Sequence, residues 1–81
     1  MSTQVRLLYF AALSEAAGME AESIQTDAAD LATLYAQVSA RHGLGWPLSG
    51  LRVAVDGLFA QWGDPVREGS EIVFIPPVSG G

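Results

Sequence analysis

The pattern of apolar and polar positions predicts a strand near each end of the chain, each with two apolar faces. Alternate positions of the first strand fall on opposite faces, with Val5, Leu7 and Tyr9 on one and Arg6, Leu8 and Phe10 on the other. In the last strand, Glu71–Ile75, one face carries Ile72 and Phe74 and the other carries Val73 and Ile75. One face of each strand is expected to lie in the core, so the other needs an explanation.

Apolar residues at helical spacing predict one main helix. Asp30 is a suitable N-cap, and the apolar positions that follow it are Leu31, Leu34, Tyr35 and Val38. This helix is expected to end with Arg41, His42 and Gly43. A shorter helix is predicted over Ala11–Ala17 and is closed by Gly18, because glycine commonly follows the last helical residue.

Turn residues and further extended segments complete the order of elements. Glu20–Thr26 predicts an edge strand, and Gly43–Gly50 predicts a loop or a single tight turn. Asp56-Gly57 favours a two-residue hairpin turn between strands at Arg52–Val55 and Leu58–Gln61. The order of strand, short helix, strand, long helix and three extended segments indicates an α+β fold.

The second apolar face predicts a docking surface for a protein partner. If the first and last strands are neighbours, their outer faces are continuous and lie beside the C-terminal arm. The residues expected on this surface are Leu8, Phe10, Phe59, Val73 and Ile75. The alternative is that a helix of the same chain covers this face.

Composition limits the kinds of partner and site. Eighty-one residues make one small domain, 1–81, and a formal charge of −5 with no lysine argues against nucleic-acid binding and favours a basic protein partner. The chain has no cysteine and a single histidine, so no zinc or redox site is expected. No apolar run is long enough to span a membrane. We expect a soluble, cytoplasmic protein that binds no cofactor or metal of its own.

Few side chains are candidates for chemistry. His42 is expected in the last turn of the main helix, where a positive charge complements the helix dipole. The glycines lack the spacing and the lysine of nucleotide-binding loops. The carboxylates expected in turns and at helix starts are interpreted as solvated: Glu15, Glu20, Glu22, Asp27 and Asp30.

The C-terminal segment is the strongest functional signal. Pro76 and Pro77 stop the last strand and begin an extended arm, which continues through Val78, Ser79, Gly80 and Gly81. Because glycine has no Cβ, a Gly-Gly end can thread a narrow active-site channel. We therefore expect the Gly81 carboxylate to be the reactive group. The alternative is an ordinary frayed terminus.

The whole chain resembles the MoaD-type family, the small sulfur-carrier subunits of molybdopterin synthase, which have a ubiquitin-like β-grasp fold. The resemblance is most specific from Asp64-Pro65-Val66 through Glu71–Ile75 to the ending Pro-Pro-Val-Ser-Gly-Gly. It implies a mixed sheet of about five strands packed on one main helix. Two departures are Ile75, where the family often has Phe, and Ser14, where some members carry Arg.

The resemblance also implies a reaction cycle. A ubiquitin-activating-like adenylyltransferase uses ATP and magnesium to convert the Gly81 carboxylate to an acyl-adenylate, and a persulfide sulfur then displaces AMP to leave a thiocarboxylate. The large subunit of the synthase supplies most catalytic side chains for transfer of this sulfur to the cyclic pyranopterin precursor, within an expected heterotetramer. The small subunit is then a carrier that is consumed and recharged rather than an enzyme by itself.

Three other interpretations use the same fold. A thiazole-pathway sulfur carrier shares the Gly-Gly end, but its relatives are usually shorter and lack the Pro-Pro-Val-Ser spacer. A ubiquitin-like protein modifier would form isopeptide bonds, although a chain without lysine cannot build lysine-linked chains on itself. A plain interaction module would not need a free terminus.

Overall fold

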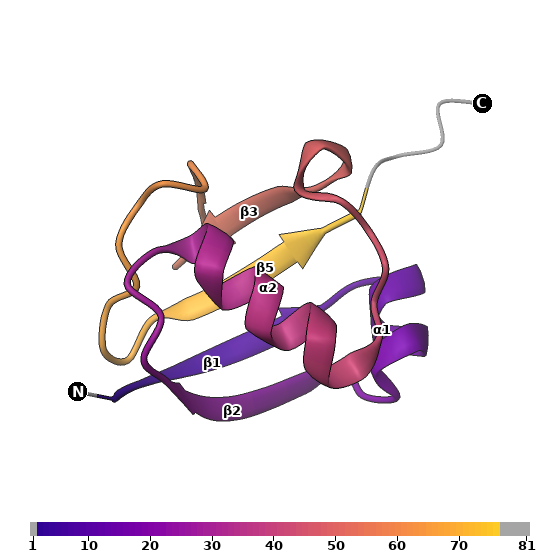
Figure 1. The fold of residues 1–81 in the computed structure, drawn as a ribbon, viewed down its shortest axis with the longest axis horizontal. Helices are drawn as coiled ribbons and strands as arrows, with labels where there is room; N and C mark the ends of the chain where they lie inside the picture. The colour runs from indigo at the N-terminus through magenta and orange to yellow at the C-terminus, as the bar shows by residue number, and fades with distance from the viewer. Residues whose placement is uncertain (1, 77–81) are drawn as a thin grey trace.

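Five strands form one mixed sheet, and a 12-residue helix lies across one of its faces (Figure 1). The computed structural model describes residues 2–76. The elements are β1 (Thr3–Tyr9), α1 (Ala12–Ala17), β2 (Ala21–Thr26), α2 (Leu31–His42), a 3₁₀ turn (Leu48–Gly50), β3 (Arg52–Val55), β4 (Leu58–Ala60) and β5 (Glu71–Ile75). Within residues 2–76, no helix has the length and apolar character that crossing a membrane requires.

The strand order is β2-β1-β5-β3-β4. The first and last strands, β1 and β5, are adjacent and parallel, while the other neighbouring pairs are antiparallel. β2 lies at one edge, as the sequence predicts. The predicted mixed sheet with one main helix is confirmed. The condition for a continuous outer face, that the first and last strands are neighbours, is met.

The main helix α2 begins and ends at the residues that the sequence indicates. The Asp30 carboxylate accepts a 2.8 Å hydrogen bond from the backbone N–H of Thr33, which holds the pKa of Asp30 below its usual value. Gly43 follows the helix in the left-handed region, with φ 64°. The buried face of α2 packs on the core face of the sheet; together these faces supply Val5, Leu7, Tyr9, Leu31, Leu34, Tyr35, Val38, Ile72 and Phe74.

The hairpin between β3 and β4 is confirmed, with one difference at its end. Asp56 and Gly57 have φ values of 51° and 87°, as the central residues of a type I′ turn require. The sequence predicts that the second strand continues to Gln61, which is wrong because β4 ends at Ala60. The backbone N–H of Gln61 donates instead to the Asp64 carboxylate at 3.0 Å, so the chain turns there.

The turn between β1 and α1 holds an alanine in an unfavourable conformation. Ala11 has φ 51° and ψ −122°, and the turn is closed by a 3.0 Å hydrogen bond from the Leu13 N–H to the Phe10 carbonyl. Such a backbone costs a residue with a Cβ about 1–3 kcal/mol. Glycine avoids this cost, but relative to alanine it lowers the stability of the fold by about 0.4–1 kcal/mol, because it gives the unfolded chain more conformational freedom.

We therefore expect Ala11→Gly to raise the free energy of unfolding by about 1 kcal/mol, which corresponds to about 4–8 °C in Tm for a domain of this size. Thermal unfolding followed by circular dichroism measures the change. Ala12→Gly is the matched control, because this neighbour begins α1 and glycine there should destabilise by about 0.5–1 kcal/mol. A lower Tm for Ala11→Gly would show that the backbone at this position is not strained.

Candidate functional site

A row of apolar side chains crosses the sheet on the face opposite α2. Residues directly opposite one another on neighbouring strands share a face. Leu8 of β1 lies opposite Val73 of β5, Val73 lies opposite Ala54 of β3, and Ala54 lies opposite Phe59 of β4. Three of these four residues are predicted from the sequence for the docking surface; Ala54 is not.

A second row lies nearer the C-terminal end of β5. Ile75 lies opposite Arg52, which begins β3. Phe10 directly follows β1 and is 52% exposed, whereas the preceding Tyr9 is 2% exposed and belongs to the core. We call the apolar residues of both rows the open face: Leu8, Phe10, Ala54, Phe59, Val73 and Ile75.

The open face carries the expected exposed apolar surface. Phe59 is 71% exposed, and Leu8, Val73 and Ile75 are partly exposed. Within residues 2–76, the main helix covers the core face of the sheet and leaves this side uncovered, contrary to the alternative that a helix shields it. At the far end of the sheet the pattern becomes polar, because Arg6 lies opposite both Glu71 and Ser23.

A depression of about 540 Å³ lies where the open face meets the start of the arm. It is open to solvent, and its lining residues are Ser49, Gly50, Leu51, Arg52, Phe59, Ile75 and Pro76. The Arg52 guanidinium carbon lies 5.8 Å from the centre of the Phe59 ring, within the range of a cation–π contact. Nothing in the sequence pattern singles out Arg52.

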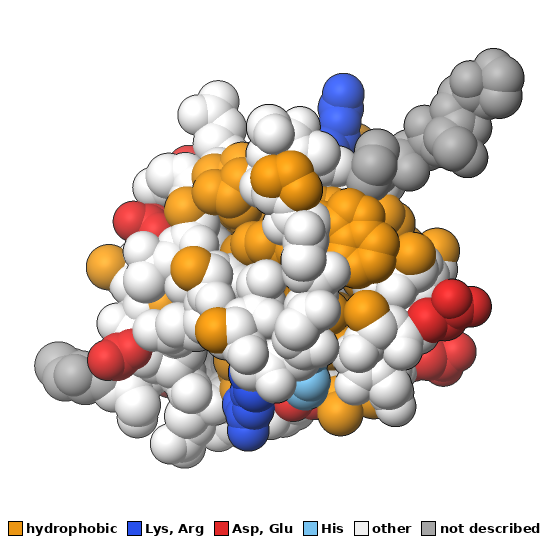
Figure 2. Space-filling view, turned by 45° about the vertical axis from the view of Figure 1, so that its right-hand side comes forward, with side chains coloured by type: hydrophobic (Ala, Val, Ile, Leu, Met, Phe, Trp, Pro, Cys, Tyr) orange, Lys and Arg blue, Asp and Glu red, His pale blue; other side chains and the backbone are white. Residues whose placement is uncertain are grey.

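The loop that follows α2 supplies one wall of this depression. The Tyr35 hydroxyl donates a 2.7 Å hydrogen bond to the Trp46 carbonyl and so ties the loop to the helix. Trp46 and Leu48 are partly buried against the core. Figure 2, turned by 45° from the view in which α2 lies in front of the sheet, shows hydrophobic side chains gathered in the upper part of that face of the molecule, with acidic side chains toward its margins.

Only the first residue of the predicted arm lies in the described part of the chain. β5 ends at Ile75, immediately before Pro76, as predicted from the two prolines. Pro77, Val78, Ser79, Gly80 and Gly81 lie outside the described residues. Pro76, the first residue of the arm, therefore lies beside the open face and lines the depression.

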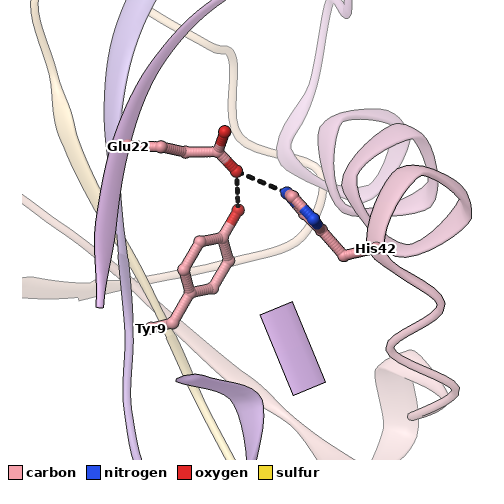
Figure 3. A network of polar contacts seen from close by, with 3 residues as sticks. All are labelled: Tyr9, Glu22 and His42. Atoms are coloured by element: carbon pink, nitrogen blue, oxygen red, sulfur yellow. Dashed lines mark hydrogen bonds and ion pairs between the residues drawn. The ribbon is translucent and has the colours of Figure 1, made fainter. Parts of the chain in front are cut away.

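A polar cluster links three elements near the C-terminal end of α2 (Figure 3). The Tyr9 hydroxyl donates to Glu22 Oε2 at 2.6 Å, and His42 Nε2 lies 2.6 Å from the same oxygen. Burial raises the pKa of Glu22, but the contacts with Tyr9 and His42 outweigh it, and the pKa lies below its usual value. Burial and the Glu22 carboxylate both raise the pKa of Tyr9.

This cluster corrects the interpretation of Glu22 as a solvated acid in a turn. Glu22 lies in β2 and is partly buried, because it pairs with residues of β1 and α2. His42 does lie in the last turn of α2, as predicted, but its contact with Glu22 was not foreseen. In residues 2–76, no group of three or more His, Cys, Asp or Glu side chains is placed to hold a metal ion.

The cluster makes the stability of the fold depend on pH. Since the pKa of Glu22 is lower in the folded than in the unfolded chain, its stabilising effect is complete above the unfolded-state value and is lost as pH falls through the folded-state value. We expect Glu22→Gln to lower the free energy of unfolding at neutral pH by about 1–2 kcal/mol, because hydrogen bonds to a charged group are lost. The deficit should shrink in acid, where the wild-type carboxyl is also neutral.

Urea unfolding at neutral and acidic pH measures this difference. Glu20→Gln is the control, because Glu20 is exposed and its side chain has no partner within the described residues. Equal stability of the two variants at neutral pH would contradict the role given to Glu22.

A family model identifies the chain over almost its whole length. The model of the ThiS family matches residues 7–81, which run from the last three residues of β1 through β5 to the Gly-Gly end. No curated protein matches the chain.

Solved structures share the fold. SAMP1 from Haloferax volcanii is 25% identical, with a TM-score of 0.80 over 96% of this chain and 99% of that one. Subunit 1 in a complex of subunits 1 and 2 of the molybdopterin-converting factor from Helicobacter pylori is similar: the match is 26% identical, with a TM-score of 0.65 over 98% and 100% of the two chains. An archaeal ubiquitin from Caldiarchaeum subterraneum, at 15% identity and a TM-score of 0.66 over all of both chains, shares the fold alone. The predicted ubiquitin-like β-grasp fold is confirmed.

Proposed function

The chain belongs to the ThiS family, and we propose that it is the sulfur-carrier subunit of a molybdopterin synthase, charged at the Gly81 carboxylate. The observation that carries the proposal is the place of the open face. It lies beside Pro76, where the arm leaves the sheet, so a partner docked on the face also receives the arm. The family match extends through Gly81, the residue to be charged.

Activation of Gly81 is the task of a partner, because a carboxylate is a poor acyl donor. A ubiquitin-activating-like adenylyltransferase joins a carboxylate oxygen to the α-phosphorus of ATP, and magnesium pyrophosphate leaves. The terminal sulfur of a persulfide then attacks the carbonyl carbon and displaces AMP. A thiol cleaves the resulting acyl disulfide, which leaves a thiocarboxylate on Gly81 and a new disulfide on the donor.

The thiocarboxylate sulfur is the nucleophile of the second stage. It attacks a side-chain carbon of the cyclic pyranopterin precursor held by the large subunit and displaces an oxygen substituent from that carbon, so that a thioester joins Gly81 to the precursor. Water then hydrolyses this thioester, returning the Gly81 carboxylate and leaving the sulfur on the pterin. Two such deliveries complete the dithiolene. Within the described residues of this chain, the open face and its depression serve docking and contribute no nucleophile to either stage.

Two observations favour the molybdopterin pathway. The ending Pro-Pro-Val-Ser-Gly-Gly resembles that of MoaD-type carriers. The similar Helicobacter pylori protein is solved in complex with subunit 2 of the molybdopterin-converting factor, which supports a large-subunit partner for this chain. We place the reaction in the cytoplasm, where ATP and the activating partner are available.

Protein modification is the second candidate function, because the chain is 25% identical to SAMP1 from Haloferax volcanii. A second similar structure is that of the small archaeal modifier protein 1 of the same organism. Both functions begin with the same adenylate and differ in the acceptor. A thiazole-pathway carrier is a further alternative within the ThiS family. These three functions share the fold, so they are distinguished by the molecule that accepts the group from Gly81.

Single-turnover transfer tests the proposed function. The thiocarboxylated chain is mixed with the large subunit from the same organism and with the cyclic pyranopterin precursor, and the pterin product is followed by mass. We expect two sulfur atoms to be gained per precursor and two chains to return to the carboxylate. Transfer to a thiazole precursor, or to lysines of other proteins, with none to the pterin would contradict the molybdopterin assignment.

A further inference from the structure

Among residues 2–76, Arg52 is the only charged residue that lines the depression at the base of the arm. It is exposed, it lies opposite Ile75 in the sheet, and its guanidinium rests over the Phe59 ring. The only ion pair among residues 2–76 joins His42 to Glu22, so Arg52 has no carboxylate partner within the described part of the chain. Any partner that covers the open face therefore contacts the Arg52 guanidinium, which lies over an aromatic ring and is flanked by apolar side chains.

A covering partner must compensate for the lost hydration of this cation. Removing a charge from water without a partner group is costly, so an entirely apolar partner would be opposed at Arg52. A carboxylate compensates best, since the planar guanidinium can donate two parallel hydrogen bonds to its oxygens. The Phe59 ring keeps the guanidinium in place and reduces the conformational freedom lost on binding.

The net negative charge of the chain restricts which partners can supply a carboxylate at Arg52. With a formal charge of −5, the chain attracts a partner whose surface is basic. At Arg52 the same partner needs the opposite sign. The expected partner therefore has a basic surface on which one carboxylate lies among apolar side chains. This carboxylate lies beside the point at which the partner receives the arm.

We propose that Arg52 determines the specificity of the open face and pairs with a carboxylate on the synthase large subunit. The inference rests on the proposed function, since it takes the large subunit as the partner. The pair fixes the register of docking next to Pro76, so it also sets where the arm enters.

The test is the dissociation constant, with its association and dissociation rates, for the purified chain and the large subunit from the same organism. We expect Arg52→Glu to raise Kd by about 30-fold or more, mainly through faster dissociation, and Arg52→Gln by about 10-fold. Arg67→Glu is the matched control: it changes the net charge equally, but Arg67 is exposed beside Val55 and Pro65, away from the open face. It should change Kd by less than about 3-fold, through association alone.

Charge reversal of the facing carboxylate, Asp or Glu to Arg in the large subunit, should restore binding to Arg52→Glu. Thermal unfolding establishes whether the variants are folded. If Arg52→Glu does not fold, the Kd of Arg52→Gln is compared with the wild-type value instead. Equal effects of Arg52→Glu and Arg67→Glu, with tight binding by the wild type, would overturn the role of Arg52 and leave the proposed function standing. Absence of binding by the wild-type chain would overturn both.

Discussion

Adding one alanine after Gly81 is expected to abolish sulfur loading. The Gly81 carbonyl becomes part of an amide, and the new carboxylate lies about 3.3–3.6 Å further along the chain, next to a Cβ. A pocket shaped for a glycine carboxylate then presents the wrong atom to the α-phosphorus of ATP. A misplacement of this size costs at least about 100-fold in rate, so adenylation should fall below detection. Exchange of pyrophosphate into ATP by the activating partner measures it.

The matched control adds one alanine before Met1, at the other end of the chain. This extension changes the length equally and should leave pyrophosphate exchange at the wild-type rate. Both variants should show the wild-type Tm, since neither addition touches the core. Full exchange by the C-terminally extended chain would favour a plain interaction module, which needs no free terminus.

Phe59→Asp is expected to abolish binding to the large subunit while leaving the fold intact. The side chain is 71% exposed, so the substitution removes little from the core. In the complex it replaces a large apolar contact with a carboxylate that must lose its hydration, and truncating a single interface anchor already costs about 2–4 kcal/mol. We therefore expect Kd to rise by about 100-fold or more. Titration calorimetry measures the loss, and circular dichroism reports the fold.

Leu58→Asp is a close control, because it makes the same change in the neighbouring residue. Leu58 is 74% exposed, but it lies opposite Val55, which lies opposite buried Ile72, so it shares the core-side face of the sheet. Leu58→Asp should leave Kd within about 3-fold of the wild type, as surface changes away from an interface usually do. Equal loss of binding in both variants would place the partner on the sheet edge rather than on the open face. Phe10→Asp is expected to behave like Phe59→Asp.

The sequence predicted those parts of the fold that depend on local pattern. The apolar spacing from Leu31 to Val38 and the cap at Asp30 specify α2. The alternation in Glu71–Ile75 places Ile72 and Phe74 together on one face of β5, which is the buried face in the structure. Pro76 marks the end of that strand because it lacks an N–H donor. Gln61 was assigned to a strand wrongly, since its bond to Asp64 competes with the sheet and is not visible in hydrophobic periodicity.

The parts that the sequence missed depend on contacts between distant segments. Glu22 is drawn into a cluster by Tyr9 and His42, which lie 13 and 20 residues away along the chain. Arg52 is not evident from the sequence, because its position opposite Ile75 and over Phe59 follows from the register of three strands. The shared outer face of Leu8, Val73 and Ile75 could be predicted because parity along a strand assigns faces without knowledge of register, and the docking role of that face stays a prediction.

The mass of the C-terminal peptide shows directly whether Gly81 carries sulfur. The chain is isolated from its native cell, and also incubated with the activating partner, ATP, magnesium and a persulfide donor. We predict the mass gain of one sulfur in place of one oxygen, located by fragmentation on Gly81. A carboxylate that remains unchanged after the complete incubation, in a chain that binds the activating partner, would contradict the assignment of this protein as a sulfur carrier.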